Sequence, residues 1–375
     1  MTALAIPPMR PISSNLDVDT SLIDVIVSKI DTTEDSSTKY AFWNNKGGTG
    51  KTSLCFQSVN FYAETHPEER ILAIDACPQA NLSELFLGGL TGSGSARLLQ
   101  QHGQVPRCSL GGYFQVRLPS PFKTPVFSPH DFITNPSAMN SEIPANIRLV
   151  CGDPLLELQS NAINTLSNTQ IPGIDTWISI VDWISDFLQL IDDEFDMIFF
   201  DCNPSFSIYT QIALASVDRL VVPVMADDSS RRALQNAMSL LYGLSLPSPL
   251  YTTYAFSTKL LNAGRILPKV HLIAKNRITQ YMGPASAYAA VLSQIETDVR
   301  GLLRTNQSLF TFSNVASGTV EIRDFQTTGV VAFAKGLPFF RLRSGKQSIG
   351  GKRVQVKEEY RLQVVTSINA LVASL

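Results

Sequence analysis

The sequence is short of charge. Of its 375 residues, 17% are charged, against about 25% in a typical soluble domain, and the formal net charge is −2. Such a chain has no overall basic field, so any binding of nucleic acid must come from a local patch. The hydrophobic share of 44% is ordinary, which argues against a globally disordered protein.

Cysteine is scarce and scattered. No two cysteines form a Cys-x-x-Cys pair, and the five are Cys55, Cys77, Cys108, Cys151 and Cys202. Their odd number and irregular spacing argue against a disulfide framework, a structural zinc site and a cysteine-bound iron–sulfur cluster. The same pattern suits a reducing compartment.

Long apolar runs are missing as well. No stretch approaches the ~18 apolar residues of a membrane-spanning helix, and residues 1–17 lack the apolar core of a signal peptide. The segment 358–375 can form a helix, but it lacks the basic flank and bulky aromatic face of a membrane anchor, so we expect it to pack on the sheet. These absences predict a cytoplasmic protein without a membrane partner.

What the sequence does contain is an alternation of strand and helix patterns from residue 40 onward. Helical patterns, including those at 54–64, 155–166 and 177–191, separate short apolar runs that predict strands at 40–43, 70–74, 146–152, 195–201, 219–224 and 270–276. Such alternation indicates βαβ units. We expect an α/β fold with a mostly parallel, twisted sheet and helices on both faces.

Two segments fall outside this alternation. Residues 1–39 begin with several prolines, carry six acids against three bases, and predict an N-terminal extension that is either a partly ordered tail or a partner-docking segment. Residues 91–145 are rich in Pro, Gly and Ser and predict an irregular insertion, a lid or a partner surface. Apart from that insertion, residues 40–375 are expected to form one domain.

The most informative stretch is Lys-Gly-Gly-Thr-Gly-Lys-Thr, residues 46–52, which follows a predicted strand and opens a helix. Its glycines let several backbone N–H groups point at one anion, and the helix N-terminus adds the positive end of a dipole. Lys51 is placed to reach the β- and γ-phosphates of a nucleotide, and the Thr52 hydroxyl to bind Mg²⁺. We expect nucleotide contacts from Lys46, Gly47, Gly48, Thr49, Gly50, Lys51, Thr52 and Ser53.

This loop has Asn45 where the strict phosphate-loop pattern has glycine, and it carries the additional Lys46. In both respects it resembles the deviant Walker A motif of the ParA/MinD family of ATPases. The resemblance covers roughly 40–375 without the insertion. It continues through a switch I-like segment at 75–82, a Walker B strand with switch II at 195–207, a following strand and loop at 219–230, an adenine-side segment at 272–277, and Ala334, Gly336 and Pro338 within 320–340.

The resemblance implies an ATP-dependent homodimer in which ATP and Mg²⁺ lie between the two copies. Lys46 would cross to the partner's phosphates, so catalytic roles are implied for Lys46, Lys51 and Asp75. Asp201 would hold Mg²⁺ with Thr52, partly through water. Asp75 has the alternative role of a helix cap. Nucleotide contacts are also implied for Asn276 and Pro338.

Cys77 departs from the family's pattern, which usually has a second Asp there that positions the attacking water. A thiol is a weak hydrogen-bond partner and is mostly neutral near pH 7. Hydrolysis is therefore expected to be slow or to depend on another residue, unless the loop simply tolerates the replacement.

The C-terminal part is locally basic, with eight bases against two acids over 335–361. Many proteins of the ParA type bind DNA without sequence preference, and the physical basis is the neutralisation of phosphates. The resemblance implies DNA contacts at Arg277, Arg341, Arg343, Lys346, Lys352 and Arg353. A solvated face, or a surface for an acidic protein, would have the same composition.

Two functions fit these observations. The first is a ParA-like ATPase whose ATP-bound dimer binds DNA or a protein adaptor, for partition or positioning of DNA or a large assembly, in the cytoplasm and on the nucleoid. The second is a non-hydrolysing adaptor in which ATP fixes a protein complex. Turnover of ATP distinguishes the two.

Overall fold

The computed structural model describes residues 37–279 and 287–375, which lie in one compact unit. Nearly all of the predicted extension 1–39 lies outside these ranges. The described residues form an eight-stranded sheet in the order β3-β4-β2-β5-β1-β6-β7-β8 and a separate two-stranded hairpin. The strands of the large sheet are β1 (Thr38–Phe42), β2 (Ile71–Ala76), β3 (Ile133–Thr134), β4 (Ile147–Val150), β5 (Met197–Cys202), β6 (Arg219–Met225), β7 (Lys269–Ile278) and β8 (Thr319–Arg323).

All the strands from β4 to β8 in that order run parallel, and β3 pairs antiparallel with β4 at the edge. The predicted fold class is therefore confirmed. Because the strands are parallel, the carboxyl ends of β1, β2, β5 and β6 share one edge, where ligands gather in open α/β folds.

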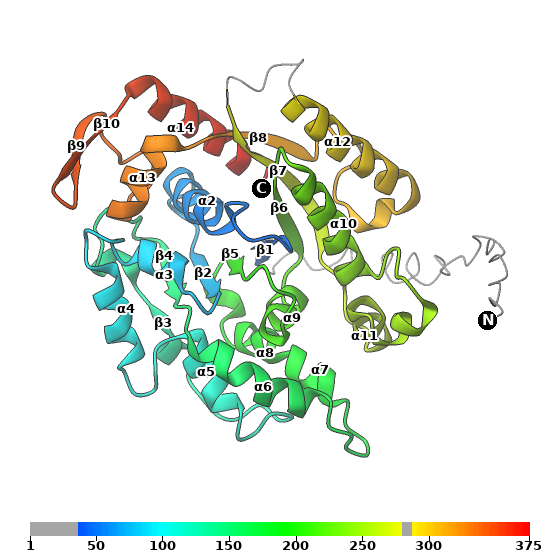
Figure 1. Cartoon of the computed structure of the whole chain (residues 1–375). Coiled ribbons are helices and arrows are strands. Elements are labelled where there is room, and N and C mark those ends of the chain that lie inside the picture. The colour runs from blue at the N-terminus through cyan, green and yellow to red at the C-terminus, as the bar shows by residue number, and fades with distance from the viewer. Residues whose placement is uncertain (1–36, 280–286) are drawn as a thin grey trace, which may run out of the picture. The chain divides into compact units, whose positions relative to one another are not determined.

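Helices cover both faces of the sheet (Figure 1). Successive strand residues point to opposite sides, so Ala41 and Trp43 lie in one hydrophobic core while Tyr40 and Phe42 lie in the other. One core is covered by α2 (Lys51–Thr65), α3 (Asn81–Phe86), α4 (Gly94–His102), α13 (Gln326–Lys335) and α14 (Glu358–Val372). The other is covered by α5 (Leu110–Arg117), α6 (Leu155–Ser167), α7 (Thr176–Val181), α8 (Trp183–Gln189), α9 (Ile208–Ala215), α10 (Asp228–Tyr242), α11 (Phe256–Asn262) and α12 (Ala287–Thr305).

The segment 91–145 is more ordered than its composition predicts. It contains α4, α5 and strand β3 rather than an irregular chain. Helix α5 begins after Ser109, whose hydroxyl accepts a hydrogen bond from the Gly112 N–H at 3.0 Å and so caps the helix. The two glycines in its first turn hide this helix from sequence patterns, because glycine has low intrinsic helix propensity.

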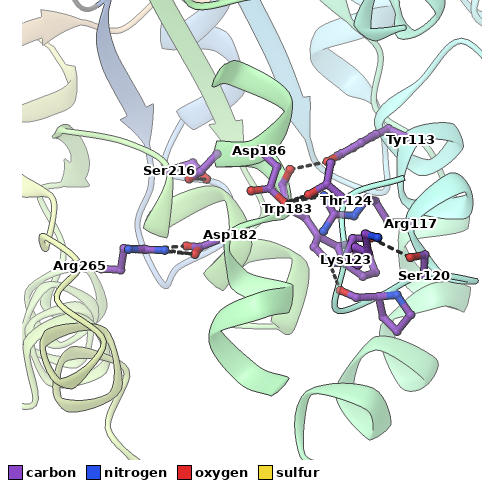
Figure 2. Close-up of polar contacts among 12 residues, drawn as sticks. Tyr113, Arg117, Ser120, Lys123, Thr124, Asp182, Trp183, Asp186, Ser216 and Arg265 are labelled. Atoms are coloured by element: carbon purple, nitrogen blue, oxygen red, sulfur yellow. Dashed lines mark hydrogen bonds and ion pairs between the residues drawn. The ribbon is translucent and has the colours of Figure 1, made fainter. Parts of the chain in front are cut away.

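A buried polar network fixes this segment to α8 (Figure 2). The Arg117 guanidinium, 1% exposed in its side chain, donates to Asp186 Oδ2 at 2.6 Å and lies over the Trp183 ring, 5.3 Å from its centroid. Thr124 donates to the same carboxylate oxygen at 2.8 Å, and the Trp183 indole N–H donates to the Pro121 carbonyl at 2.9 Å. Tertiary contacts of this kind order a segment that its local sequence leaves undecided.

The helix predicted over 177–191 is two short helices, α7 and α8, joined at Asp182. Asp182 has ψ −1°, far from the helical value of about −42°, and its carboxylate is held by the Arg265 guanidinium (Figure 2). The apolar periodicity continues through this break, which is why one helix was expected.

The C-terminal helix α14 buries Val364, Ile368 and Leu371 in the core that it shares with α2, as expected for a helix that packs on the protein. Just before it comes the hairpin of β9 (Gly345–Ile349) and β10 (Lys352–Val356). Within the described ranges, no helix is both long and apolar enough to cross a bilayer.

Candidate functional site

The phosphate loop connects β1 to α2 at the carboxyl edge of the sheet. Gly48 and Gly50 have φ of 75° and 93°, conformations that strain any residue with a Cβ. A side chain at Gly50 would also collide with the Asn276 amide. Gly47 and Gly48 are exposed. The loop therefore curls at the N-terminus of α2, in the geometry that binds phosphate.

Two asparagines tie this loop to neighbouring strands. The Asn44 amide donates to the Pro223 carbonyl at 2.7 Å, and the Asn45 amide donates to the Pro204 carbonyl at 3.1 Å. The departure from glycine at position 45 thus adds a link between the phosphate loop and the segment after β5.

Lys51 is the first residue of α2 and points back across the loop. Its Nζ donates to the Lys46 carbonyl at 2.8 Å. Burial lowers the pKa of this lysine, and the nearby Asp201 opposes that shift. The ammonium is held against the loop backbone, at the place where a bound phosphate would neutralise it.

The Lys46 side chain makes its contacts at the start of α10. Its Nζ donates to both carboxylate oxygens of Asp227, at 2.7 and 2.8 Å, and to the Ser230 hydroxyl at 3.1 Å. Asp227 also caps α10, since its Oδ1 accepts from the Ser230 N–H at 2.7 Å. Burial works against the Asp227 charge, but the hydrogen bonds from Lys46 and Ser229 outweigh it and lower the pKa to about 2.

The sequence analysis did not single out Asp227 as a site residue. The signal that could have found it is the Asp-Asp-Ser-Ser run that follows β6, which is a typical helix N-cap pattern.

Asp201 is the penultimate residue of β5 and is 1% exposed. Neither of its carboxylate oxygens has a hydrogen-bond partner among the described residues. Burial, and then the charge of Asp75, raise its pKa. A buried carboxylate without partners is costly, and Mg²⁺ with its water shell takes such oxygen ligands. Together with Thr52 in the first turn of α2, this residue fits the predicted Mg²⁺ site.

Asp75 stands opposite Asp201 in the register of β2 and β5, but its oxygens are occupied. Oδ1 accepts from the Cys77 N–H at 3.1 Å, and Oδ2 accepts from the Ser83 N–H at 2.9 Å and the Ser83 hydroxyl at 2.8 Å. Burial raises its pKa against the pull of these hydrogen bonds. Asp75 therefore fixes the loop that leads into α3 and accepts the N–H of Ser83 in the first turn of that helix, although the N-cap residue of α3 is Ala80. Its catalytic role stays a prediction.

Cys77 lies in the same loop and is buried. Burial raises its pKa to about 12, so the group is a neutral thiol near pH 7. Its sulfur accepts a hydrogen bond from the Asn203 amide at 3.7 Å. The sequence analysis did not name Asn203, which follows β5 and whose Oδ1 accepts from the Ser205 N–H at 2.9 Å. No spacing rule links residues 77 and 203.

The structure places Asn276 directly on the phosphate loop. Its amide donates to the Thr49 carbonyl at 2.8 Å and is itself buried, so it braces the loop. Pro338 is also buried, and its neighbours are held by Gln57 of α2, which bonds the Leu337 carbonyl and the Phe339 N–H. Contacts from Asn276 or Pro338 to a nucleotide stay predictions.

The predicted DNA-binding residues divide into two groups. Arg277 is exposed at the end of β7. The other five lie on or just before the β9–β10 hairpin, and of these Arg341 forms an ion pair with Glu64 at 3.0 Å. The structure thus brings Lys346, Lys352 and Arg353 together on one hairpin, with Arg343 two residues before it.

A family of known proteins matches the part of the sequence that contains this site. The model of a family described as AAA domain matches residues 37–244, which is more than half of the chain and contains the loop, Asp75 and Asp201. A search of curated proteins found no match.

Several solved structures share the fold. An ATP complex of a McdA variant from Cyanothece is 13% identical, with 90% of this chain and 97% of that chain covered and a TM-score of 0.56. Apo McdA from Cyanothece is 14% identical, with 80% and 91% covered and a TM-score of 0.54. A Borrelia burgdorferi protein assigned to plasmid partition and bound to AMPPNP is 13% identical, with 90% and 100% covered and a TM-score of 0.50.

At such identities the likeness shows the fold, while the family match rests on the sequence itself. The phosphate loop with its additional lysine, the Walker B aspartate and the family match lead to one conclusion: the chain belongs to the AAA-domain P-loop ATPases of the ParA/MinD type.

Proposed function

We propose that this protein is an ATP-switched ATPase in which ATP and Mg²⁺ join two copies into a dimer that binds DNA or a protein adaptor. The process served is partition or positioning of DNA or of a large assembly, in the cytoplasm and on the nucleoid. The observation that carries the proposal is the pair formed by the curled phosphate loop and Asp201, whose buried carboxylate has no hydrogen-bond partner in the described ranges.

Each residue at this edge of the sheet has a separate task in the proposal. Backbone N–H groups of residues 47–50 and the Lys51 ammonium bind the phosphates. Thr52 and Asp201 hold Mg²⁺, which supplies charge neutralisation at the β- and γ-phosphates. Asn276 keeps the loop in shape through its bond to the Thr49 carbonyl.

Lys46 is the residue proposed to act on the second copy. Its side chain is 24% exposed and turns away from its own loop toward Asp227. To reach a partner's phosphates it must exchange the Asp227 carboxylate for a phosphate oxygen. Phosphate carries more negative charge than a carboxylate, so the exchange is favourable only when ATP is present in the partner.

DNA and a protein adaptor are the proposed partners of the dimer. Arg343, Lys346, Lys352 and Arg353, on and just before the β9–β10 hairpin, support binding to a polyanion, because Lys and Arg that neutralise phosphates supply most of the nonspecific affinity for DNA. An adaptor that stimulates hydrolysis would reset the switch by returning the protein to monomers.

A second candidate function rests on Cys77. The position that usually carries a water-positioning Asp in this family holds a buried thiol, and the neighbouring Asp75 has its oxygens occupied by Cys77 and Ser83. If the one unoccupied carboxylate, Asp201, holds Mg²⁺, no further free carboxylate of this group orients water, and ATP would act as a lasting structural ligand. The protein would then be a nucleotide-sensing adaptor in a protein complex.

One experiment tests both candidates: light scattering of the full chain over time, with ADP–Mg²⁺ and with ATP–Mg²⁺. A dimer that forms with ATP and decays supports the switch, and a dimer that persists supports the adaptor. No dependence on ATP would contradict both and leave only nucleotide binding.

Matched variants assign the roles of the two lysines. Lys51→Ala is expected to lose ATP, whereas Lys46→Ala is expected to bind ATP but remain monomeric. Asp227→Ser keeps a residue that can cap α10 and removes the ion pair with Lys46, so it should dimerise at lower ATP concentration. Equal behaviour of Lys46→Ala and wild type would remove Lys46 from the proposal.

A further inference from the structure

The β9–β10 hairpin is a small two-stranded ribbon. Its two antiparallel strands are joined by Gly350 and Gly351, whose φ values are 54° and 79°. Two residues with positive φ make the turn type whose twist matches that of the paired strands. In Figure 1 the hairpin lies beside α13 and α14, away from α10 and α12.

One face of the ribbon anchors it to the protein. Val356 is buried in the core below α13 and α14, and Ile349 and Val354 pack against that core. Lys335 on α13 donates to the Gln347 side chain at 2.8 Å. The hairpin is therefore held at a fixed orientation.

The opposite face is entirely polar. In the register of the hairpin Arg353 pairs with Ser348 and Gln355 with Lys346, and all four side chains are exposed. Because side chains alternate along a strand, these four stand together on the outward side. We call them the outer face of the hairpin.

The surroundings of the outer face add positive charge. Residues 341–357 contain six bases and no acid. In the described part of the chain no ion pair involves five of them, which are Arg343, Lys346, Lys352, Arg353 and Lys357. Like charges so close together repel, so this element favours a polyanionic partner.

We propose that the hairpin is an arm that enters the major groove of double-stranded DNA with its outer face inward. The proposal rests on the proposed function in that DNA is a partner of the protein. Two strands about 4.8 Å apart fit a groove about 12 Å wide and 8.5 Å deep. Lys346 and Arg353 face phosphates and guanine edges, and Ser348 and Gln355 face base edges.

The composition of the outer face favours this partner over others. A protein interface has an apolar and aromatic core, and the outer face has no apolar side chain. Single-stranded nucleic acid is bound by stacking on aromatic residues, which the outer face also lacks. A narrow strip of hydrogen-bonding and cationic side chains is what a groove in duplex DNA accommodates.

The test is binding of a fluorescent DNA duplex to the full chain with ATP–Mg²⁺, followed by anisotropy. The double variant Lys346→Glu, Arg353→Glu should weaken binding about 100-fold, since each contact to a base edge or phosphate contributes roughly tenfold. The control Arg300→Glu, Arg304→Glu changes the charge equally on exposed positions of α12 and should cost less than about threefold. Replacing Lys346 and Arg353 by Ala should lower the log–log salt slope by about 1.8.

A second variant tests entry into the groove itself. Ser348→Ala with Gln355→Ala leaves the charge and the salt slope unchanged but should weaken duplex binding several-fold. All these positions are exposed, so circular dichroism and thermal unfolding should match wild type. If this variant binds duplex as wild type does, the hairpin does not enter the groove.

Other outcomes separate the failure of this inference from that of the function. Equal losses from the hairpin variant and the α12 control would overturn the hairpin's role and leave DNA binding in place. Tighter binding to polyglutamate than to duplex, lost in the hairpin variant, would make the arm a surface for an acidic protein. If the wild type binds no duplex with either ATP–Mg²⁺ or ADP–Mg²⁺, then DNA is not a partner of this protein, and that part of the proposed function is wrong as well.

Discussion

Asp75 and Asp201 lie one residue before the ends of neighbouring parallel strands and stand opposite each other in register, but one has three hydrogen bonds and the other none in the described structure. Both are buried, and burial raises the pKa of both. The difference comes from the chain that follows each strand. After Asp75 the chain turns back, so that the N–H groups of Cys77 and Ser83 point at the carboxylate. After Asp201 the chain continues toward the phosphate loop, where the Pro204 carbonyl accepts from the Asn45 amide.

The comparison shows that an aspartate near the end of a strand can either stabilise the following loop or be left available for a ligand. Asp75 stabilises the loop before α3, because three donors compensate its desolvation. Asp201 adds to the cost of folding in the absence of a cation, because Thr52 and the charge of Lys51 compensate its desolvation only in part. The stability cost of Asp201 at this edge of the sheet is therefore explained by a role in binding a cation.

The largest expected effect is on folding at Asp75. Asp75→Ala removes the acceptor of three buried donors and should lower the free energy of unfolding by about 3 kcal/mol. Asp201→Ala, measured the same way in EDTA, should leave stability unchanged or raise it. Chemical denaturation followed by circular dichroism gives both values, and equal losses at the two positions would end the comparison.

The second effect is on metal-dependent binding at Asp201. Asp201→Asn keeps the size of the side chain but weakens the hold on Mg²⁺, and it should reduce affinity for a non-hydrolysable ATP analogue with Mg²⁺ about 30-fold. The difference should vanish in EDTA. Calorimetric titration of wild type and Asp201→Asn with the analogue measures this difference in affinity, and Asp75→Asn is the matched control. If Asp201→Asn retains the full effect of Mg²⁺ on nucleotide affinity, the assigned Mg²⁺ site is wrong.

A third carboxylate sharpens the comparison. Cys77→Asp introduces a free carboxylate beside Asp75 and Asp201, and it should raise Mg²⁺–ATP turnover about tenfold if the thiol limits hydrolysis. It should also lower stability in EDTA, because three acids would then share a buried site. Phosphate release measures turnover, and Cys77→Ser, which adds no charge, should behave as wild type. No gain in turnover would mean that another residue orients water.

The smallest effect is a pH dependence. Asp201 has a raised pKa in the metal-free native state and a value near 3.9 when unfolded. Between those values the native state holds a proton that the unfolded state lacks, so stability falls as pH rises from about 4 toward the native pKa. Relative to Asp201→Asn, the wild type should lose about 1 kcal/mol per pH unit between about pH 5 and the native pKa in EDTA. Thermal unfolding at several pH values measures the difference in stability between wild type and Asp201→Asn. If that difference does not change with pH, Asp201 is already charged and compensated in the native state.

Much of the sheet could be predicted because its strands are buried on both faces. β5 is an unbroken apolar run up to Asp201, and the expected boundaries of β2, β6 and β7 lie within a residue or two of those observed. α5 could not be predicted, because its order depends on Ser109 and on the Arg117 network rather than on local propensity.

The candidate site divides in the same way. The phosphate loop could be read from the sequence, since glycine and lysine at fixed spacing have a direct physical meaning there. The partners of that loop could not. Lys46 meets Asp227, which is 181 residues later, and Thr49 meets Asn276, which is 227 residues later. Contacts of this kind follow from the strand order, which no local pattern contains.

The burial of the cysteines has a practical consequence for spectroscopy. All five lie in the described ranges and all are buried, and burial raises the pKa of each thiol. Since thiolates are the species that react with maleimides, the native chain should label very slowly. A cysteine introduced at the exposed Ser348 would then take up a dye alone, so the outer face of the hairpin can carry a single fluorophore in an otherwise native protein.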